Sequence, residues 1–211
     1  MDALGDEMKA YEAASCDATL DMTRPCVVRL DGHCFGTFTS GFAKPYDLRI
    51  HRAMVATTGD LLERFHAATA YTESDEISLF FPPTVGDSTA LPFNGRVQKL
   101  ASVTAGYASA RFNLHMMREA FDVADAKDAA LRARVESCGA HFDSRAFSLP
   151  DVERVAAYMR WRAIHDCRRN SISMLAQASG SLGAADVEPH RGLTALSRTC
   201  RRRRVDVGGV G

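Results

Sequence analysis

The order of apolar segments between residues 26 and 149 constrains the fold more than any other feature of this sequence. Short apolar runs bounded by Pro, Gly and Asp alternate with long segments of helical periodicity. The predicted elements, in chain order, are strand 26–30, helix 47–66, strands 68–72 and 77–81, helix 94–117 and strand 141–149. This is the split βαββαβ order, so the sequence predicts an α+β, ferredoxin-like domain with strand order 4-1-3-2.

That topology brings two carboxylates together although they lie far apart in the chain. Asp31 follows the first strand, and Asp75 lies in the segment Glu73-Ser74-Asp75-Glu76 between the second and third strands. In the 4-1-3-2 order the end of the first strand meets this hairpin, so Asp31 and Asp75 are expected at one edge of the sheet. Strand alternation places Glu76 on the opposite face from Asp75, so Glu76 is not expected to bind metal directly.

Further helices are expected around this unit. Residues 5–15 have an amphipathic pattern, and residues 119–138 are charged and rich in Ala, which indicates a partly helical, exposed segment. Pro150-Asp151 opens a third long helix that is expected to extend to about Gln177. Asp47 is expected to cap the first long helix, and Asn94 the second. After residue 180 the periodicity is lost, so we expect one domain over 1–180 and a disordered tail over 181–211.

Composition limits the class of protein. Apolar residues make up 46% and charged residues 25%, as in globular domains, and 26 basic residues balance 26 acidic ones. A net charge of zero excludes a chain that is basic overall but permits a local basic face. The six cysteines have no zinc-site spacing, and no apolar run approaches a membrane span. The sequence therefore predicts a soluble intracellular protein with free thiols.

Two Asp side chains at one sheet edge can share divalent cations, since Mg²⁺ prefers carboxylates together with phosphate oxygens and water. Two such ions can activate an attacking hydroxyl and stabilise a departing pyrophosphate. The same residues have a structural interpretation, because Asp-Gly at a strand end and Ser-Asp-Glu in a hairpin are also ordinary turn sequences. Residue types and spacing leave both interpretations open.

Candidate phosphate contacts lie in three other places. The loop Gly32-His33-Cys34-Phe35-Gly36 offers successive backbone amides, which can cradle a triphosphate, although it matches neither the P-loop nor the dinucleotide-binding pattern. Lys44 lies in a segment stiffened by Pro45, and Arg96 and Lys99 share one helix face. A basic cluster at residues 165–170 could contact a nucleic-acid backbone. Solvated surface charge remains an alternative for each of them.

Five sequence blocks in consistent order resemble one known family. They are VRLDGHCFGTFTSGFAKPYD, YTESDEISLFF, LPFNGRVQKLASVTAGYASARFN, HFDSRAFSLPD and RNSISMLAQ. They resemble the conserved blocks of the tRNA-His guanylyltransferases and the Thg1-like proteins, and together they cover about residues 5–180. The resemblance implies a palm like that of conventional polymerases, with added helices, in a nucleotidyltransferase that extends tRNA in the 3′–5′ direction.

The resemblance also assigns roles to individual residues. Asp31 and Asp75 would hold two Mg²⁺ ions together with the carbonyl of Gly32, and residues 31–36 with Ser74 and Asp75 would hold GTP or ATP. Lys44, Arg96 and Lys99 match basic residues of the family and would contact phosphate or tRNA, with Lys44 in a catalytic role, and Asn170 is placed among these contacts. The tRNA 5′-phosphate would be activated with a nucleotide, which the 3′-hydroxyl of GTP then displaces.

Several alternatives stay open from the sequence. The segment RNSIS is more like the Thg1-like branch, which is associated with repair of 5′-truncated tRNA, than like the eukaryotic tRNA-His enzymes. A palm-fold nucleotidyl cyclase shares the topology and the paired Asp residues, and a non-catalytic tRNA-binding remnant is a third possibility. A homo-oligomer, dimer or tetramer, is expected from the family. The expected location is the cytoplasm, with the mitochondrion and nucleus left open.

Overall fold

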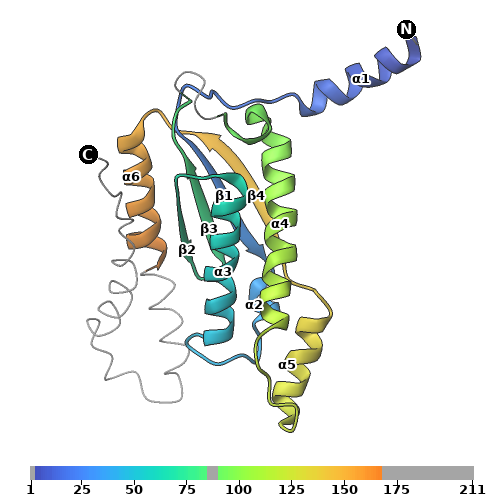
Figure 1. Cartoon of the computed structure of the whole chain (residues 1–211), viewed down its shortest axis with the longest axis vertical. Coiled ribbons are helices and arrows are strands. Elements are labelled where there is room, and N and C mark those ends of the chain that lie inside the picture. The colour runs from blue at the N-terminus through green and yellow to red at the C-terminus, as the bar shows by residue number, and fades with distance from the viewer. Residues whose placement is uncertain (1–2, 85–89, 168–211) are drawn as a thin grey trace, which may run out of the picture.

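The computed structural model describes residues 3–84 and 90–167 (Figure 1). Its helices and strands follow the predicted order around one sheet. They are α1 (Ala3–Cys16), β1 (Cys26–His33), α2 (Phe35–Phe38), α3 (Leu48–Phe65), β2 (Thr69–Glu73), β3 (Glu76–Phe81), a 3-10 turn (Pro92–Gly95), α4 (Val97–Met117), α5 (Ala126–Glu136), β4 (His141–Ser148) and α6 (Val152–Trp161), followed by a π-helical turn (Arg162–Cys167).

The four strands form one antiparallel sheet in the order β2-β3-β1-β4, which confirms the predicted 4-1-3-2 topology. Strand β1 is central because its apolar sequence can be buried on both sides by its neighbours. It pairs with β3 from Cys26 opposite Phe81 to Asp31 opposite Glu76, and with β4 along its whole length. This register fixes which residues share a face of the sheet.

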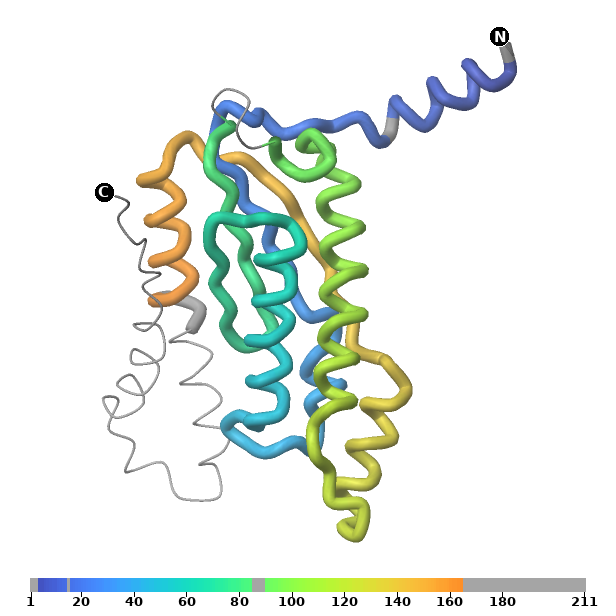
Figure 2. Tube along the Cα trace, in the orientation of Figure 1, coloured from blue at the N-terminus to red at the C-terminus, as the bar shows by residue number. Residues whose placement is uncertain are grey.

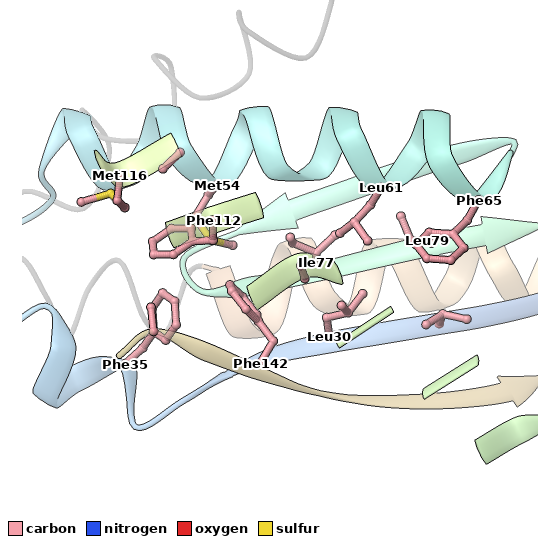
Figure 3. Close-up of a cluster of buried hydrophobic side chains, with 14 of the residues drawn as sticks. Leu30, Phe35, Met54, Leu61, Phe65, Ile77, Leu79, Phe112, Met116 and Phe142 are labelled. Carbon is pink, nitrogen blue, oxygen red and sulfur yellow. The ribbon is translucent and has the colours of Figure 1, made fainter. Parts of the chain in front are cut away.

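Helices α3 and α4 cover one face of the sheet and form the main core (Figure 1). Alternate residues of the central strands point into it, among them Leu30, Ile77 and Leu79, which are fully buried (Figure 3). Phe112 on α4 packs against Phe35 and Phe142 at ring-centroid distances of 5.2 and 5.7 Å. Each such side chain stabilises the fold by about 1.5–3 kcal/mol on burial, so the end of β1 rests on a rigid support.

The opposite face of the sheet carries the charged residues and is partly covered by α6. Tyr158 of this helix contacts Phe80 and Phe147 at ring-centroid distances of 6.3 and 5.5 Å. Phe80 and Phe147 both lie opposite Val27 in the ladders, so they share its face. Further along this face the same strands present Arg29, Asp31 and Glu76, which makes it the candidate functional face considered below.

Several predicted boundaries were wrong in the region of the site. The first strand was expected to end at residue 30, but β1 continues to His33, so Asp31 lies inside the sheet and not after it. The continuation is possible because β4 pairs with β1 up to His33. The predicted loop after it also contains the single turn α2.

The second long helix does not begin at Asn94, as predicted from its capping propensity. Phe93, Asn94 and Gly95 all have left-handed backbone conformations, with φ of 57°, 53° and 71°, so they form a tight turn. Helix α4 starts only at Val97, with Arg96 in the cap position. By contrast, Asp47 caps α3 as predicted, because its carboxylate accepts a hydrogen bond from the amide of Arg49.

The third helix differs from its predicted length within the described residues. Asp151 caps α6, as its sequence indicates, but the α-helix ends at Trp161 and continues as a π-helical turn. Helix α5 is less exposed than predicted, since Leu131 and Val135 are buried against the core. Helix α1, by contrast, projects away from the body of the protein (Figure 2). None of the described helices is both long and apolar enough to cross a membrane.

Candidate functional site

The central feature of the candidate site is the contact between the end of β1 and the β2–β3 hairpin. The amide of Gly32 donates a hydrogen bond of 3.0 Å to the carbonyl oxygen of Asp75. Asp31, one residue earlier, lies opposite Glu76, one residue later, in the β1–β3 ladder. The structure therefore brings Asp31 and Asp75 to the same edge of the sheet, as the topology predicts.

The hairpin that carries Asp75 is tight. Only Ser74 and Asp75 separate β2 from β3, and Ser74 has a left-handed conformation with φ of 53°. Such a conformation is uncommon outside Gly, Asn and Asp and is often found at functional sites. Ser74 is exposed and Asp75 is half-buried, so both can be reached by a ligand from the edge of the sheet.

An arginine connects Asp31 to the neighbouring strand. Nη2 of Arg29 lies 2.7 Å from Oδ2 of Asp31 and 2.6 Å from Oε2 of Glu76. Arg162, after α6, donates from Nε to Oε1 of Glu76 at 2.8 Å and from Nη2 to Oε2. Both carboxylate oxygens of Glu76 are therefore engaged by arginines, whereas Asp31 receives one charged partner and lies at the end of this chain of ion pairs.

Burial and charge both act on Asp75. Removal from water raises the pKa of the Asp75 carboxyl, and the nearby negative charge of Asp31 raises it further. Hydrogen bonds from its own amide and from the Ser74 side chain, together with the charge of Arg29, oppose this shift. Two carboxylates that repel each other in a partly buried position favour a divalent cation between them.

Gly32 is required where it stands by close packing. A Cβ atom at this position would lie 2.3 Å from Cδ2 of Phe35 and 2.5 Å from its Cγ. Phe35 cannot move away easily, because its ring is buried among Phe38, Phe112 and Phe142. The absence of a side chain at Gly32 therefore lets the aromatic core approach the strand that carries Asp31.

The remaining residues of the predicted triphosphate loop form the corner after β1. Cys34 has a left-handed conformation with φ of 53°, and its carbonyl accepts hydrogen bonds from the amides of Thr37 and Phe38 in α2. His33 is exposed and stacks on His141 of β4, with ring centroids 5.1 Å apart. Because the amide of Gly32 is already bonded to Asp75, it cannot also donate to a phosphate.

Lys44 is exposed in the segment between α2 and α3, which lies at the same end of the sheet as the carboxylates (Figure 1). The Lys44–Pro45 peptide bond is cis. The segment is anchored at both ends by buried residues, Phe42 and Asp47, and the amide of Ala43 donates to Oδ2 of Asp47 at 3.1 Å. The ammonium group of Lys44 is thus presented on a short, tethered loop.

Arg96 and Lys99 lie apart from the carboxylates. They stand at the beginning of α4, and the preceding turn is bonded to residues 18–20, before β1 begins. The end of β1 is level with Ser109, whose hydroxyl binds the amide of Phe142 opposite Gly32. Ten residues of helix separate Lys99 from Ser109, a span of about 15 Å. Asn170 and the other predicted contacts after 167 lie outside the described residues.

Within the described ranges 3–84 and 90–167, no three His, Cys, Asp or Glu side chains are grouped closely enough to hold a metal ion by themselves. Asp31 and Asp75 supply the hard oxygen donors that Mg²⁺ prefers, and Mg²⁺ usually completes its shell with water and substrate phosphate. The pair therefore fits an ion that binds together with a nucleoside triphosphate.

Sequence reasoning missed the ion pairs around Glu76. The spacing of Arg29 and Asp31 contained a signal, since residues i and i+2 of a strand share a face. The register of the β1–β3 ladder, which was not predicted from the sequence, adds Glu76 to that face as the partner of Asp31. Nothing local to the sequence places Arg162 there, because its contact with Glu76 depends on how α6 packs across the sheet.

Comparison with known proteins agrees with this geometry. The family model for tRNAHis guanylyltransferase matches residues 5–150, which include both carboxylates and Lys44. The chain belongs to this family. It is also 31% identical over 149 residues to the tRNA(His) guanylyltransferase of Neurospora crassa and 35% identical over 181 residues to an uncharacterised protein of Acanthamoeba polyphaga mimivirus.

Solved structures of similar proteins share the fold. A bacterial tRNA(His) guanylyltransferase-like protein in complex with GTP is 36% identical, with a TM-score of 0.71 over 86% of this chain and 79% of that one. Such a bacterial protein in complex with ATP is 37% identical, with a TM-score of 0.72 over 86% and 72% of the two chains. The Saccharomyces cerevisiae enzyme, 20% identical, has a TM-score of 0.63 over 91% and 77% and supports the fold alone.

The chain is shorter than its curated relatives. The matched region covers 82% of this chain but 62% of the mimivirus protein, and 69% of this chain but 46% of the Neurospora crassa enzyme. Residues 5–150, which match the family model, contain the whole sheet and both Asp residues.

Proposed function

We propose that this protein is a tRNA 5′-end guanylyltransferase, which adds a guanine nucleotide in the 3′–5′ direction to tRNA-His or to 5′-truncated tRNA. The observation that carries the proposal is the pairing of Asp31 and Asp75 through the bond between Gly32 and Asp75. This pairing lies within the segment that matches the family model. Similar bacterial proteins have been solved with GTP and with ATP, which supports nucleoside triphosphates as substrates here.

In this proposal Asp31, Asp75 and the carbonyl of Gly32 hold two Mg²⁺ ions. When bound, Mg²⁺ supplies activation of a hydroxyl nucleophile and neutralisation of a departing phosphate group. Asp31 is oriented by Arg29, which is itself held by Glu76. The corner at residues 33–36 and the exposed Ser74 hydroxyl lie beside the carboxylates and would hold the triphosphate.

The basic residues divide into two groups by position. The segment between α2 and α3, which carries Lys44, is at the carboxylate end of the sheet (Figure 1), so Lys44 would contact a phosphate of the nucleotide or of the activated tRNA 5′ end. Arg96 and Lys99 stand at the beginning of α4, away from the carboxylates, and this separation suits the tRNA backbone better than the triphosphate. The tRNA 5′-phosphate first displaces pyrophosphate from ATP; the 3′-hydroxyl of GTP then attacks the activated phosphate and displaces AMP.

A non-catalytic tRNA-binding role is the second candidate, because the chain spans only 62% and 46% of the two curated relatives. The match to the guanylyltransferase family model over residues 5–150 argues against a nucleotidyl cyclase. A homo-oligomer in the cytoplasm remains our expectation; sedimentation of the purified protein tests the oligomer.

The experiment that distinguishes these candidates is incorporation of labelled GTP into 5′-monophosphorylated and 5′-triphosphorylated tRNA with Mg²⁺ and ATP. Full-length tRNA-His and a tRNA that lacks its first nucleotide are compared. Addition only to tRNA-His indicates a maturation enzyme, and addition that restores pairing on the shortened tRNA indicates a repair enzyme. Tight tRNA binding without addition to either would contradict the enzymatic proposal.

A further inference from the structure

The segment that presents Lys44 is held by a cluster of polar and aromatic side chains from the start of α3, from α5 and from the chain before each of these helices. Its downstream anchor is Asp47, which is only 7% exposed and caps α3. The Asp47 carboxylate binds the amide of Ala43 at 3.1 Å, immediately before Lys44, as well as the amide of Arg49 at 3.0 Å. The conformation around Lys44 therefore depends on where the Asp47 carboxylate is held.

Arg49 holds that carboxylate through both of its oxygens. Nε of Arg49 donates to Oδ1 of Asp47 at 3.0 Å, and Nη2 donates to Oδ2 at 2.9 Å. The third edge of the guanidinium is used as well, because Nη1 donates to Oδ1 of Asp128 on α5 at 2.9 Å. A planar guanidinium bonded to two carboxylates in this way has little freedom to rotate.

Two aromatic rings also contact the same guanidinium. Cζ of Arg49 lies 5.2 Å from the ring centroid of Phe42 and 4.6 Å from that of Phe121. The two rings contact each other edge to face, with centroids 6.4 Å apart. Phe42 precedes Lys44 by two residues, so the stack ties the upstream side of the segment to the same arginine.

Helix α5 supports the segment at a second point. Asp128 is held by the amide of Asp122, which donates to its Oδ2 at 2.8 Å. Nη1 of Arg134, further along α5, donates to the carbonyl of Phe38 at 3.0 Å and to that of Ser40. Contacts from α5 thus reach the chain on both sides of Lys44, although α5 contributes no residue to the carboxylate edge.

We propose that Arg49 and Asp128 are positioning residues that fix the Lys44 segment relative to Asp31 and Asp75. The inference rests on the proposed function, in which Lys44 contacts a reacting phosphate. A lysine side chain is long and flexible, so the position of its backbone decides where the ammonium group can reach. A misplacement of a catalytic group by about 1 Å can reduce a rate by up to roughly a hundredfold. Arg49 and Asp128 can therefore affect the rate without contacting the substrate.

The test uses Asp128→Asn, which removes one of the two carboxylate charges that hold Arg49 and preserves the shape of the side chain. Glu136→Gln is the matched control, because Glu136 lies on the same helix and forms only an exposed ion pair with Arg132. We expect Asp128→Asn to lower kcat for GTP addition about tenfold with both variants folded, and Glu136→Gln to leave it unchanged. Equal activity of the two variants would overturn the proposal.

A double-mutant cycle separates positioning from general destabilisation. If Asp128 acts through Lys44, then Asp128→Asn has no further effect on kcat in a Lys44→Ala background. If the losses in kcat of the two single variants multiply in the double variant, Asp128 does not act through Lys44 and the proposal is contradicted.

Amide hydrogen exchange gives a readout that does not depend on activity. The Ala43 amide, bonded to Asp47, should exchange faster in Asp128→Asn than in the wild type and in Glu136→Gln. Unchanged protection of the Ala43 amide would overturn the proposal that Arg49 and Asp128 fix the Lys44 segment. If the wild type does not add GTP, but the Ala43 amide still exchanges faster in Asp128→Asn, then only the proposed function is contradicted.

Discussion

The amide of Gly32 and the carbonyl oxygen of Asp75 are joined by a hydrogen bond of 3.0 Å. This bond extends the β1–β3 ladder by one step beyond the pair Asp31–Glu76 and connects the central strand to the turn of the hairpin. It fixes the separation of the two strands at the point where both candidate metal ligands are attached. The geometry of the candidate site is therefore set by sheet pairing and not by a flexible loop.

Gly32→Ala is expected to damage this arrangement. The added Cβ would lie 2.3 Å from Cδ2 of Phe35, whose ring is buried in an aromatic cluster. Relief requires either displacement of the ring or a shift of the strand, so we expect a loss of about 1–3 kcal/mol in the free energy of unfolding. Urea titration measures it. Gly36→Ala, where a Cβ would contact nothing within 4 Å, is the control, and equal losses in both variants would contradict the packing explanation.

Asp75→Asn is expected to stabilise the protein in metal-free buffer. The folded-state pKa of Asp75 is raised by burial and by Asp31, so ionisation of Asp75 opposes folding. The wild type therefore loses stability relative to the variant as the pH rises through that pKa. We expect Asp75→Asn to gain about 0.5–1 kcal/mol at pH 7.5 in the presence of a chelator, and to lose this advantage in acid. A variant that is less stable than the wild type at pH 7.5 would contradict this.

Asp47→Asn tests the anchor of the Lys44 segment through its pH dependence. Hydrogen bonds from the Arg49 side chain, and from the amides of Ala43 and Arg49, lower the pKa of Asp47 to about 2 from an ordinary value of 3.8. The stabilisation is present above the unfolded-state pKa and is lost as the pH falls toward 2.

Asn can still cap α3, so the variant should lose about 2 kcal/mol at neutral pH, from the charge alone. Unfolding titrations at pH 7, 5, 4 and 3 should show the difference shrinking below pH 5, to about half by pH 3. A difference that stays constant over this range would show that the charge of Asp47 is not the source of the stability.

Glu76→Gln is expected to weaken the functional face. Glu76 is 8% exposed and neutralises two guanidinium groups, those of Arg29 and Arg162. Removal of its charge leaves both with less compensation in a poorly solvated position, at a cost of about 3 kcal/mol. Thermal or urea unfolding measures it against Glu136→Gln, where an exposed pair should cost less than about 0.5 kcal/mol. Similar losses in the two variants would contradict a structural role for the Glu76 network.

The fold could be predicted from the sequence because local signals agreed with the global topology. The apolar runs and the Asp47 cap predict the βαββαβ order, and that order determines that Asp31 meets the hairpin of Asp75. The exact start of α4 could not be predicted, since Asn94 is a good cap by type but adopts a left-handed turn with Phe93 and Gly95. Capping propensity competes there with the pairing of residues 18–20 to the same turn.

The candidate site was predictable only in part. Asp31 and Asp75 follow from topology, but the links that hold their surroundings depend on side chains distant in the sequence. Arg49 reaches Asp128, and Arg162 reaches Glu76, only after α5 and α6 have packed. Residues 119–138 have the composition of an exposed segment, and nothing in them indicates that Asp128 holds the anchor of Lys44.

The measurement that tests the central claim most directly is Mg²⁺-dependent incorporation of labelled GTP at the 5′ end of tRNA by the wild type, Asp31→Asn and Asp75→Asn. Circular dichroism and urea unfolding of the same samples establish that each variant is folded. We predict incorporation by the wild type that requires Mg²⁺, and loss to background in both folded variants, because each removes one of the two carboxylates at the sheet edge. Wild-type levels of incorporation in either variant would contradict the assignment of this edge as the catalytic site.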